Sequence, residues 1–194
     1  MEAYREELRR AVAAAMPGKE QALVFGEGPM RPKLMLIGEA PGEQETLQGR
    51  PFVGKAGKNL DRFLELARLC RGEIYISNTV KVRPTKIGKT GRIGNRPPSR
   101  EEIDLFRPWL LREIELIRPM AIATLGNVPL KTLAGAKATI GDVHGSWVPF
   151  GTGDRALFAL YHPASMIYNR SLEAVYEADV RQLAEEIAAL GDKA

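Results

Sequence analysis

The chain has 194 residues, of which 44% are hydrophobic and 27% are charged, as expected for one soluble domain spanning residues 1–194 with a single sizeable core. Its 28 Lys and Arg residues against 24 Asp and Glu leave a net charge of +4, which is too small to establish nucleic-acid binding by itself. The one cysteine, Cys70, excludes an intramolecular disulfide framework and any metal cluster held by several cysteines.

The first 16 residues are interpreted as an amphipathic helix and not as a signal peptide, because they carry acidic residues and only a short Ala-rich apolar run. No stretch of the chain approaches membrane-spanning length. We therefore expect a cytoplasmic protein with no membrane partner.

Four short runs rich in Leu, Ile, Val and Ala predict buried strands, because each is followed by turn-forming residues. They lie at residues 33–37, 73–77, 120–125 and 156–161. Segments with helical spacing lie at residues 55–69, 99–117, 127–133 and 172–190. Ser99 and Glu102 form a capping-box pattern at the start of the second of these helices, and Pro119 follows its end.

Strands that alternate with helices predict an α/β fold, here a three-layer α/β/α sandwich around a central, mainly parallel four-stranded sheet. Polar or Gly-rich clusters follow the predicted strands. They are residues 38–42, Asn78 with Lys81, Gly126 with Asn127, and residues 162–165. Because ligands of such sheets bind beyond the carboxyl ends of the strands, we expect these clusters to meet in one crevice.

A loop dense in Gly, Pro and basic residues follows the second predicted strand. Between residues 81 and 98 it carries six cations and no acidic residue. The six are Lys81, Arg83, Lys86, Lys89, Arg92 and Arg96. Such a strip suits a phosphate backbone, and a simply solvated loop is the alternative.

Residues 49–56 match a phosphate-binding P-loop at every position but the last, where Ala56 cannot ligate magnesium. The motif also requires a strand directly before it, whereas residues 43–48 are polar and lack alternation. A kinase or nucleotidase is therefore disfavoured.

Two isolated residues are candidates for a site. His162 follows a predicted strand and precedes Pro163, so it is either a catalytic hydrogen-bonding residue or a structural histidine. Phe52 lies in a polar loop flanked by Gly and Pro, so it either stacks on a flat ligand or anchors the loop in the core. His144 lacks comparable placement and is interpreted as a surface or packing residue.

Seven motifs occur in an order that makes their combination specific. They are VFGEG at residues 24–28, GEAPGEQE at 38–45, GRPFVGKAG at 49–57, YISNTVKVRP at 75–84, NRPPS at 95–99, LG at 125–126 and HPAS at 162–165. With these motifs the chain resembles the family 4 uracil-DNA glycosylases over nearly its full length. The resemblance implies a uracil-DNA glycosylase-like fold and a DNA repair enzyme that flips a uracil nucleotide out of DNA and hydrolyses its glycosidic bond, leaving an abasic site.

The resemblance also implies a role for each base-binding residue. Asn78 would pair with uracil N3 and O4, and Phe52 would stack on the extruded base. Glu45 would crowd out the 5-methyl group of thymine, and backbone amides of the turn from Gly38 to Gly42 would hold the base and its sugar. His162 would donate to uracil O2, where negative charge grows as the base departs.

In other members of the superfamily an Asp assists the attacking water, and Ala40 occupies the corresponding position in this chain. Asn95 is favoured for placing the water and Glu39 for a structural or electrostatic role. After the last motif, beginning at Ser165, Met166 or Ile167 would fill the gap that the flipped base leaves in the stack. Tyr168 stands where relatives often carry Arg, so one DNA contact is expected to differ.

Family 4 proteins typically bind a four-iron, four-sulfur cluster through four cysteines. The corresponding positions here are Ala11, Ala14, Val82 and Phe106, all of them apolar. We therefore expect a protein with no metal or cofactor, in which hydrophobic packing replaces the cluster. Stoichiometric iron in the purified protein would contradict this expectation.

Two alternative functions stay open at this stage: a glycosylase for another deaminated base such as hypoxanthine or xanthine, and a catalytically weak DNA-binding homologue. The joint presence of Phe52, Asn78 and His162 argues against the second, because a pure binder needs no base pocket. The loop at residues 84–95 resembles that of a subgroup that attaches covalently to DNA through a histidine, but it contains no histidine, so we expect turnover. The resemblance implies a monomer associated with the nucleoid of a prokaryote.

Overall fold

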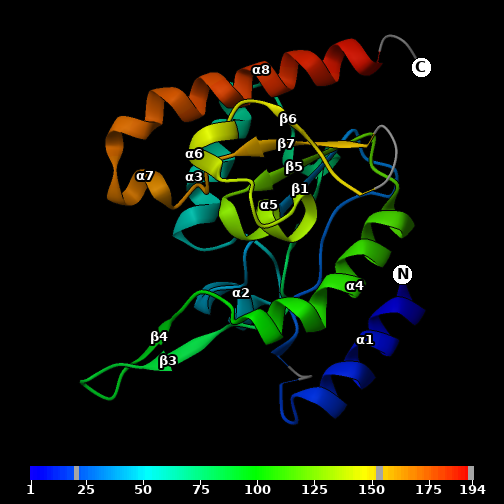
Figure 1. The fold of residues 1–194 in the computed structure, drawn as a ribbon, viewed down its shortest axis with the longest axis vertical. Helices are drawn as coiled ribbons and strands as arrows, with labels where there is room; N and C mark the ends of the chain where they lie inside the picture. Colours follow the sequence, from blue (N-terminus) through cyan, green and yellow to red (C-terminus); the bar gives the residue numbers. More distant parts are fainter. Residues whose placement is uncertain (20–21, 152–154, 192–194) are drawn as a thin grey trace.

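A computed structural model describes residues 1–19, 22–151 and 155–191 (Figure 1). Its main sheet has five strands in the order β2-β1-β5-β7-β6. Their bounds are β1 Leu34–Gly38, β2 Tyr75–Asn78, β5 Ala121–Leu125, β6 Trp147–Pro149 and β7 Ala156–Leu160.

The four predicted strands are all present and run parallel to one another, since β1 pairs with β2 and β5, and β5 pairs with β7. The sheet differs from the predicted one by a fifth strand, β6, which pairs antiparallel with β7 at the edge. β6 has three residues and ends at Pro149, so it is too short to show strand alternation in the sequence. The mainly parallel character of the sheet is confirmed.

The five predicted helical segments are all present, with ends within a few residues of those expected, and the described residues contain three further helices of four to six residues that were not predicted. Their bounds are α1 Glu2–Ala15, α2 Glu43–Gln48, α3 Lys55–Leu66, α4 Arg100–Ile117, α5 Asn127–Ala134, α6 Ile140–Val143, α7 Ser165–Tyr168 and α8 Glu173–Gly191, with short 3-10 turns at Arg71–Glu73 and Arg170–Leu172. The predicted capping box begins α4, because Ser99 Oγ accepts from the Glu102 amide at 3.2 Å and the Glu102 carboxylate accepts from the Ser99 amide at 2.7 Å. This pairing satisfies amides that the first turn of a helix leaves unpaired.

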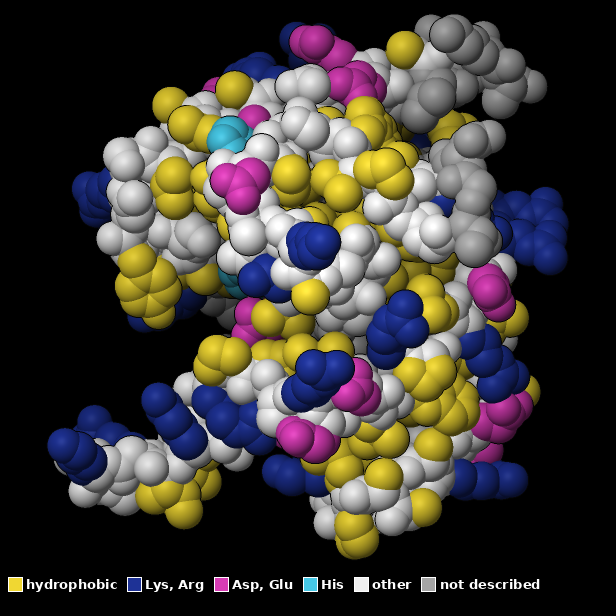
Figure 2. Space-filling view, in the orientation of Figure 1, with side chains coloured by type: hydrophobic (Ala, Val, Ile, Leu, Met, Phe, Trp, Pro, Cys, Tyr) yellow, Lys and Arg dark blue, Asp and Glu magenta, His cyan; other side chains and the backbone are white. Residues whose placement is uncertain are grey.

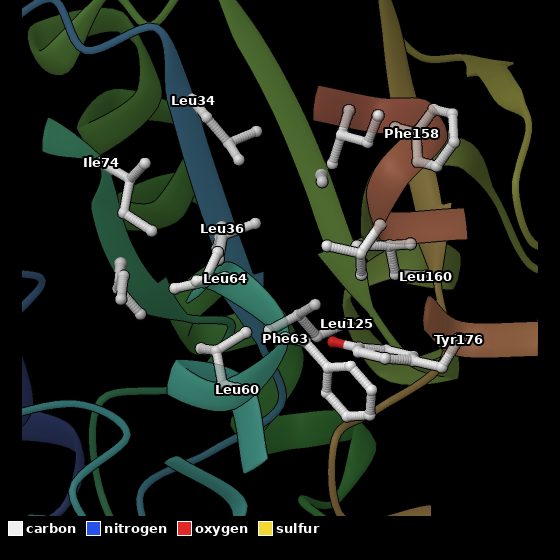
Figure 3. Close-up of a cluster of buried hydrophobic side chains, with 14 of the residues drawn as sticks. Leu34, Leu36, Leu60, Phe63, Leu64, Ile74, Leu125, Phe158, Leu160 and Tyr176 are labelled. Carbon is white, nitrogen blue, oxygen red and sulfur yellow. The ribbon is translucent and has the colours of Figure 1, made fainter. Parts of the chain in front are cut away.

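Helices cover both faces of the sheet, which confirms the three-layer sandwich. On one face, side chains of α3 and α8 such as Phe63 and Tyr176 pack on Leu36 and Leu160 (Figure 3). On the other face, α4, α5 and α6 pack on the alternate side chains of the same strands. Strands buried on both faces must be apolar throughout, which is why each appears in the sequence as a continuous hydrophobic run.

Helix α1 packs against α4 and the segment after β2 instead of against the sheet (Figure 1). Tyr4, Leu8 and Val12 form a separate apolar cluster with Val82 and Phe106, and all five side chains are almost completely buried. The N-terminal helix therefore extends the core sideways, next to the segment that leaves β2.

The segment predicted as a basic loop contains a hairpin of β3 (Thr85–Ile87) and β4 (Ile93–Asn95), which reaches away from the body of the protein (Figure 1). Three-residue strands rich in Gly and Lys carry no periodic signal, so the sequence indicated only a loop. Within the three described ranges, no helix is both long enough and apolar enough to cross a bilayer.

Candidate active site

A cavity of about 860 Å³ opens at the carboxyl ends of the parallel strands. Its walls come from residues 39–45, 52, 54–56, 84, 95–97, 162, 164 and 167–168, together with Asn78. In the space-filling view the surface is hollowed between α7 and the β3–β4 hairpin (Figure 2). Three of the four clusters predicted to converge contribute to this cavity, and the fourth, at Gly126, lies directly behind His162.

Phe52, Asn78 and His162, which are far apart in the sequence, meet around Gly38. Gly38 is paired in register with Asn78, and a Cβ atom on Gly38 would lie 2.5 Å from both Asn78 Oδ1 and Phe52 Cζ. The ring centroids of Phe52 and His162 are 5.9 Å apart. Glycine at position 38 therefore leaves the room in which an aromatic ring, an amide and an imidazole face one cavity.

The Phe52 ring packs in the core, as one interpretation expected, and it also lines the cavity, where stacking on a flat ligand stays a prediction. The side chain is 5% exposed, and the residue has a φ of 53°, which is uncommon for a residue with a Cβ atom. A Cβ on Gly57 would lie only 2.0 Å from the Phe52 carbonyl oxygen. The tight turn into α3 thus holds the ring at the cavity wall.

Asn78 ends β2 and presents its amide to the cavity from a buried position, with 3% of the residue exposed. Its Oδ1 atom is buried and has no hydrogen-bond partner among the described residues. A buried acceptor without a partner costs about 1–3 kcal/mol. A ligand that places an N–H group at this point recovers that cost.

His162 is held as a neutral hydrogen-bond donor. Its Nδ1 atom accepts from the Ala164 amide at 3.1 Å, so the ring proton is on Nε2. Burial lowers the pKa of the imidazole to about 4, against the opposing effect of the Glu45 charge. Gly126 lies behind the ring, and a Cβ there would come within 3.1 Å of His162 Cβ.

Glu45 joins the two loops that form the floor of the cavity. One carboxylate oxygen accepts from the amides of Val53 at 3.0 Å and Gly54 at 2.7 Å, and the other accepts from the Gly42 amide at 3.1 Å. These three bonds fix the position of the carboxylate between the two loops. This structural role has no signal in the sequence, because it depends on a loop eight residues further along the chain.

Glu39 and Asn95, the two candidates for placing a water, both line the cavity but differ in their contacts. Asn95 Oδ1 already accepts from Arg83 Nε at 2.7 Å. No hydrogen bond to the Glu39 carboxylate is found in the described parts of the chain, and burial raises its pKa. Of the two, Glu39 has the acceptor atoms available to a water.

The prediction that Lys81 contacts DNA is wrong. Lys81 is completely buried, and its ammonium group lies 2.6 Å from Glu113 Oε2 in an ion pair with no exposure on either side. It also donates to Ser77 Oγ at 2.6 Å and to the Asn78 carbonyl oxygen at 2.7 Å. Its spacing along the chain resembled that of the loop cations, but the first residues after β2 turn into the protein.

The other five predicted DNA-binding cations are at the surface in two groups. Lys86, Lys89 and Arg92 are exposed on the hairpin (Figure 2). Arg83 and Arg96 are half-buried at its base, where Arg83 pairs with Glu43 and Arg96 pairs with Glu102. The hairpin cations are therefore the more available for phosphate contacts.

Of the two residues proposed to fill the stack, the structure favours Ile167 over Met166. Met166 is 6% exposed and belongs to the core, which contradicts its prediction as a DNA contact. Ile167 is 46% exposed and lines the cavity, and Tyr168 beside it is 88% exposed. Ser165 begins this short helix, and its amide bonds the His162 carbonyl oxygen at 2.8 Å.

Two further interpretations from the sequence are confirmed. Residues 49–56 follow helix α2 and not a strand, so they are not a P-loop. His144 has a packing role, because its Nδ1 atom lies 2.8 Å from Asp179 and its ring stacks on Tyr161 at 4.8 Å between centroids.

The positions that correspond to cluster cysteines do not fit an iron-sulfur cluster. Val82 is 1% exposed and Phe106 is 0% exposed, and both pack against Tyr4, Leu8 and Val12. Ala11 is half-buried, but Ala14 is exposed, so α1 contributes Val12 and its neighbours to this packing instead of the predicted alanines. In the described residues no group of three or more His, Cys, Asp or Glu could hold a metal ion.

The fold and the cavity define a class of α/β protein. Its parallel sheet ends in a recessed pocket with an aromatic wall, an amide and a neutral imidazole. The family model of the uracil DNA glycosylase superfamily matches residues 25–188. The chain belongs to this superfamily.

Individual relatives agree with the predicted resemblance. The chain is 37% identical to the type-4 uracil-DNA glycosylase of Saccharolobus solfataricus over 190 residues, covering 94% of this chain and 84% of the relative. It is 34% identical to the type-4 uracil-DNA glycosylase of Thermotoga maritima over 174 residues, covering 89% and 86%. The crystal structure of Pedobacter heparinus SMUG2 has the same fold, with a TM-score of 0.51 at 14% identity over 84% of this chain and 77% of that one.

Proposed function

We propose that this protein is a DNA glycosylase that excises uracil from DNA by hydrolysing the bond between C1′ of deoxyribose and N1 of the base. The superfamily and the names of its relatives support an enzyme of this kind. The observation that carries the proposal is the buried, unpaired Oδ1 atom of Asn78, in the same cavity as Phe52 and His162.

The amide of Asn78 complements the edge of uracil. Uracil presents an N–H donor at N3 beside an acceptor at O4, so Asn78 Oδ1 accepts from N3 while its Nδ2 donates to O4. Cytosine presents an acceptor at N3 and a donor at N4, which leaves the buried amide oxygen facing a lone pair. A polar mismatch of this kind in a buried site discriminates strongly between substrates.

The cavity can receive the base only after the nucleotide has left the duplex, because the Asn78 amide is buried at its inner end. Phe52 then stacks on the base. Ile167 and Tyr168 at the rim are exposed and fill the gap in the stack. The carboxylate of Glu45, fixed by three backbone amides, stands where it limits the room for a 5-methyl group.

His162 stabilises the leaving group. As the C1′–N1 bond breaks, its electron pair passes to the base, and negative charge collects on O2. The Nε2–H group of the neutral imidazole donates to this oxygen, and a fixed donor aimed at developing charge contributes about 2.7–4 kcal/mol in comparable sites. The oxygen of the attacking water bonds to C1′, and the Glu39 carboxylate orients that water and receives its proton. The amide of Asn95 is not a base, and its oxygen is already bound to Arg83.

Hypoxanthine is the second candidate substrate, because its N1–H and O6 groups present the same donor and acceptor to Asn78 as uracil N3 and O4. The experiment that tests both uses labelled duplexes containing uracil, hypoxanthine, xanthine or thymine, incubated with the protein and cleaved with alkali. Breaks at uracil and not at thymine support the proposal. Breaks at none of the bases, despite measurable DNA affinity, would overturn it in favour of a DNA-binding homologue.

The proposal places the whole chain, as one domain and as a monomer, on the chromosomal DNA of a prokaryotic cytoplasm. No cofactor takes part in the proposed steps.

A further inference from the structure

The β3–β4 hairpin carries an exposed apolar pair. Ile87 is 78% exposed and Ile93 is 63% exposed, and the two residues are paired directly across the antiparallel strands. Directly opposed residues project from the same face of a hairpin, so the two side chains form one apolar patch. Large apolar residues grouped on an exposed hairpin mark a surface that another molecule covers.

The two faces of the hairpin differ in character. Side chains alternate along each strand, and the register pairs Lys86 with Gly94 and Thr85 with Asn95. Ile87 and Ile93 therefore share a face with Asn95, which lines the cavity. Lys86 projects from the opposite face, and no acidic residue occurs between Glu73 and Glu101. The apolar patch thus lies on the same face of the hairpin as Asn95 at the cavity rim, and the charged side chains of the hairpin are all positive.

The base of the hairpin is fixed to the body of the protein. Arg96 donates from Nε to the Thr85 carbonyl oxygen at 3.1 Å and binds both carboxylate oxygens of Glu102 at 2.6 and 2.8 Å. Arg83 bonds Asn95 at 2.7 Å on the other strand. These contacts link both strands to the cavity rim and to the start of α4, so the direction in which the hairpin leaves the rim is set.

We propose that the hairpin lies in a groove of the DNA duplex beside the extruded nucleotide, with Ile87 and Ile93 against base edges and sugars and with Lys86, Lys89 and Arg92 toward the phosphates. The inference rests on the proposed function, and it adds a contact to the duplex outside the base pocket. A two-stranded ribbon fits the major groove of B-DNA. Apolar side chains at the centre with cations around them match the chemistry of a groove between two phosphate backbones.

The length of the hairpin sets where this contact falls. At about 3.3 Å per strand residue, Ile93 lies roughly 7 Å beyond Asn95, and the end of the hairpin lies several ångströms further. Phosphates of one strand follow each other at about 3.4 Å along the helix axis. The hairpin therefore covers base pairs about two to four steps from the extruded nucleotide, on one side only.

The double variant Ile87→Thr/Ile93→Thr tests the contact, because threonine keeps the β-branched shape that suits a strand while it removes apolar surface. Binding is measured by fluorescence anisotropy with a duplex that carries a tetrahydrofuran abasic-site analogue, so that the readout does not depend on uracil excision. The control variant is Met120→Thr, which changes an apolar residue that is 45% exposed just before the amino end of β5, at the end of the strands opposite the cavity. We expect about a tenfold weaker Kd for the double variant, from the apolar area of two half-covered side chains, and no change for the control.

Shortened duplexes locate the contact. Trimming the duplex to one base pair beyond the lesion on one side is expected to weaken wild-type binding by more than the double substitution does, because it also removes the phosphates that the hairpin cations contact. The double variant is expected to lose less than the wild type on that trimming, because its apolar contact is already gone. Trimming on the other side is expected to affect both proteins equally. If the wild type and the double variant lose the same affinity on trimming, whichever side of the lesion is trimmed, the proposed contact is overturned.

Other occupants of the apolar face give different results. If the double variant binds single-stranded DNA more weakly than the wild type by the same factor as it does duplex DNA, the groove contact is overturned. A dimer of the wild type that is absent in the double variant, seen by size-exclusion chromatography with light scattering, would assign the patch to a second copy of the chain. Unchanged duplex affinity of the double variant would overturn this inference alone, whereas no duplex binding by the wild type would overturn both it and the proposed function.

Discussion

The ammonium group of Lys81 donates a hydrogen bond to the main-chain carbonyl oxygen of Asn78 at 2.7 Å, beneath the residue that faces the cavity. The same group lies 2.6 Å from Glu113 Oε2, and neither side chain is exposed. Glu113 also accepts from Ser77 Oγ at 2.9 Å and from the Tyr75 hydroxyl at 3.1 Å. This buried ion pair ties helix α4 to the end of β2, where the proposed base-binding amide is placed.

Replacement of Lys81 by Met is expected to lower the free energy of unfolding by about 3–5 kcal/mol, because it leaves the Glu113 carboxylate buried without its cation. Urea denaturation followed by circular dichroism measures the change. The double variant Lys81→Met/Glu113→Leu removes both charges and is expected to recover much of the loss. A single variant as stable as the wild type would show that the ion pair adds no net stability at this place.

The lowered pKa of His162 sets a pH dependence for activity. The imidazole is neutral above pH 4, so its Nε2 donor and its bond from Ala164 persist through the range in which an ordinary histidine titrates. The single-turnover excision rate is expected to show no inflection near pH 6.5 that depends on His162. An inflection there that disappears in His162→Asn would contradict the assignment.

The same shift affects stability. Because the folded-state pKa of about 4 lies below the unfolded value of 6.5, the unfolded chain takes up the proton first as the pH falls. The contribution of neutral His162 is therefore fully present above pH 6.5 and is lost progressively down to about pH 4. Unfolding curves of the wild type and His162→Gln, recorded between pH 7 and pH 4, are expected to converge as the pH falls. Parallel pH profiles would argue against a buried neutral histidine.

Substitution of Asn78 by Asp is expected to lower uracil excision by two or more orders of magnitude, because an ionised carboxylate accepts hydrogen bonds but cannot donate to uracil O4. Single-turnover kinetics on a uracil duplex measure the loss. The size of the side chain is unchanged, so folding is checked by the thermal midpoint. Near-normal excision by Asn78→Asp would remove the amide from the proposed mechanism.

Glu39 and Asn95 can be separated by matched amide and alanine variants. If Glu39 orients the water, Glu39→Gln is expected to lower kcat by about 10²–10⁴-fold with little change in KM, in line with general-base contributions. Asn95→Ala is expected to act less on kcat, because Arg83 already occupies its oxygen. The raised pKa of Glu39 also predicts an acidic limb of the rate profile above the usual carboxylate range, absent in Glu39→Gln. The opposite ranking of the two variants would assign the water to Asn95.

The hairpin cations are expected to set part of the salt dependence of DNA binding. The triple variant Lys86→Gln/Lys89→Gln/Arg92→Gln removes exposed charges, and for every phosphate that is no longer neutralised the slope of log K against log salt is expected to fall by about 0.9. The control is Arg181→Gln on α8, where the arginine pairs with Glu177 along the helix. An unchanged slope in the triple variant would show that these cations do not meet phosphates.

Most of the fold followed from local patterns. The strands of the centre of the sheet are buried on both faces, so they appear as short apolar runs, and the helices between them carry clear start signals such as Ser99. Strand β6 was not predicted because three residues are too few to show the alternation of a strand. The strands of the β3–β4 hairpin are equally short and were not predicted for the same reason.

The convergence of Asn78 and His162 was predictable, because the ends of parallel strands meet at one edge. Phe52 lies in the loop before α3, and only the family resemblance placed it beside them. The direction and the partners of individual side chains were not predictable. Lys81 resembled its basic neighbours in sequence, but its direction depends on Glu113, 32 positions later. The role of Glu45 likewise depends on amides from another loop. Long-range partners of this kind leave no mark in a local pattern.

The contact between α1 and α4 is made of hydrocarbon and aromatic side chains, with Tyr4, Val82 and Phe106 at its centre. Assembly of this part of the molecule depends on water leaving apolar surface, so the strength of the contact follows the hydrophobic effect and weakens on cooling.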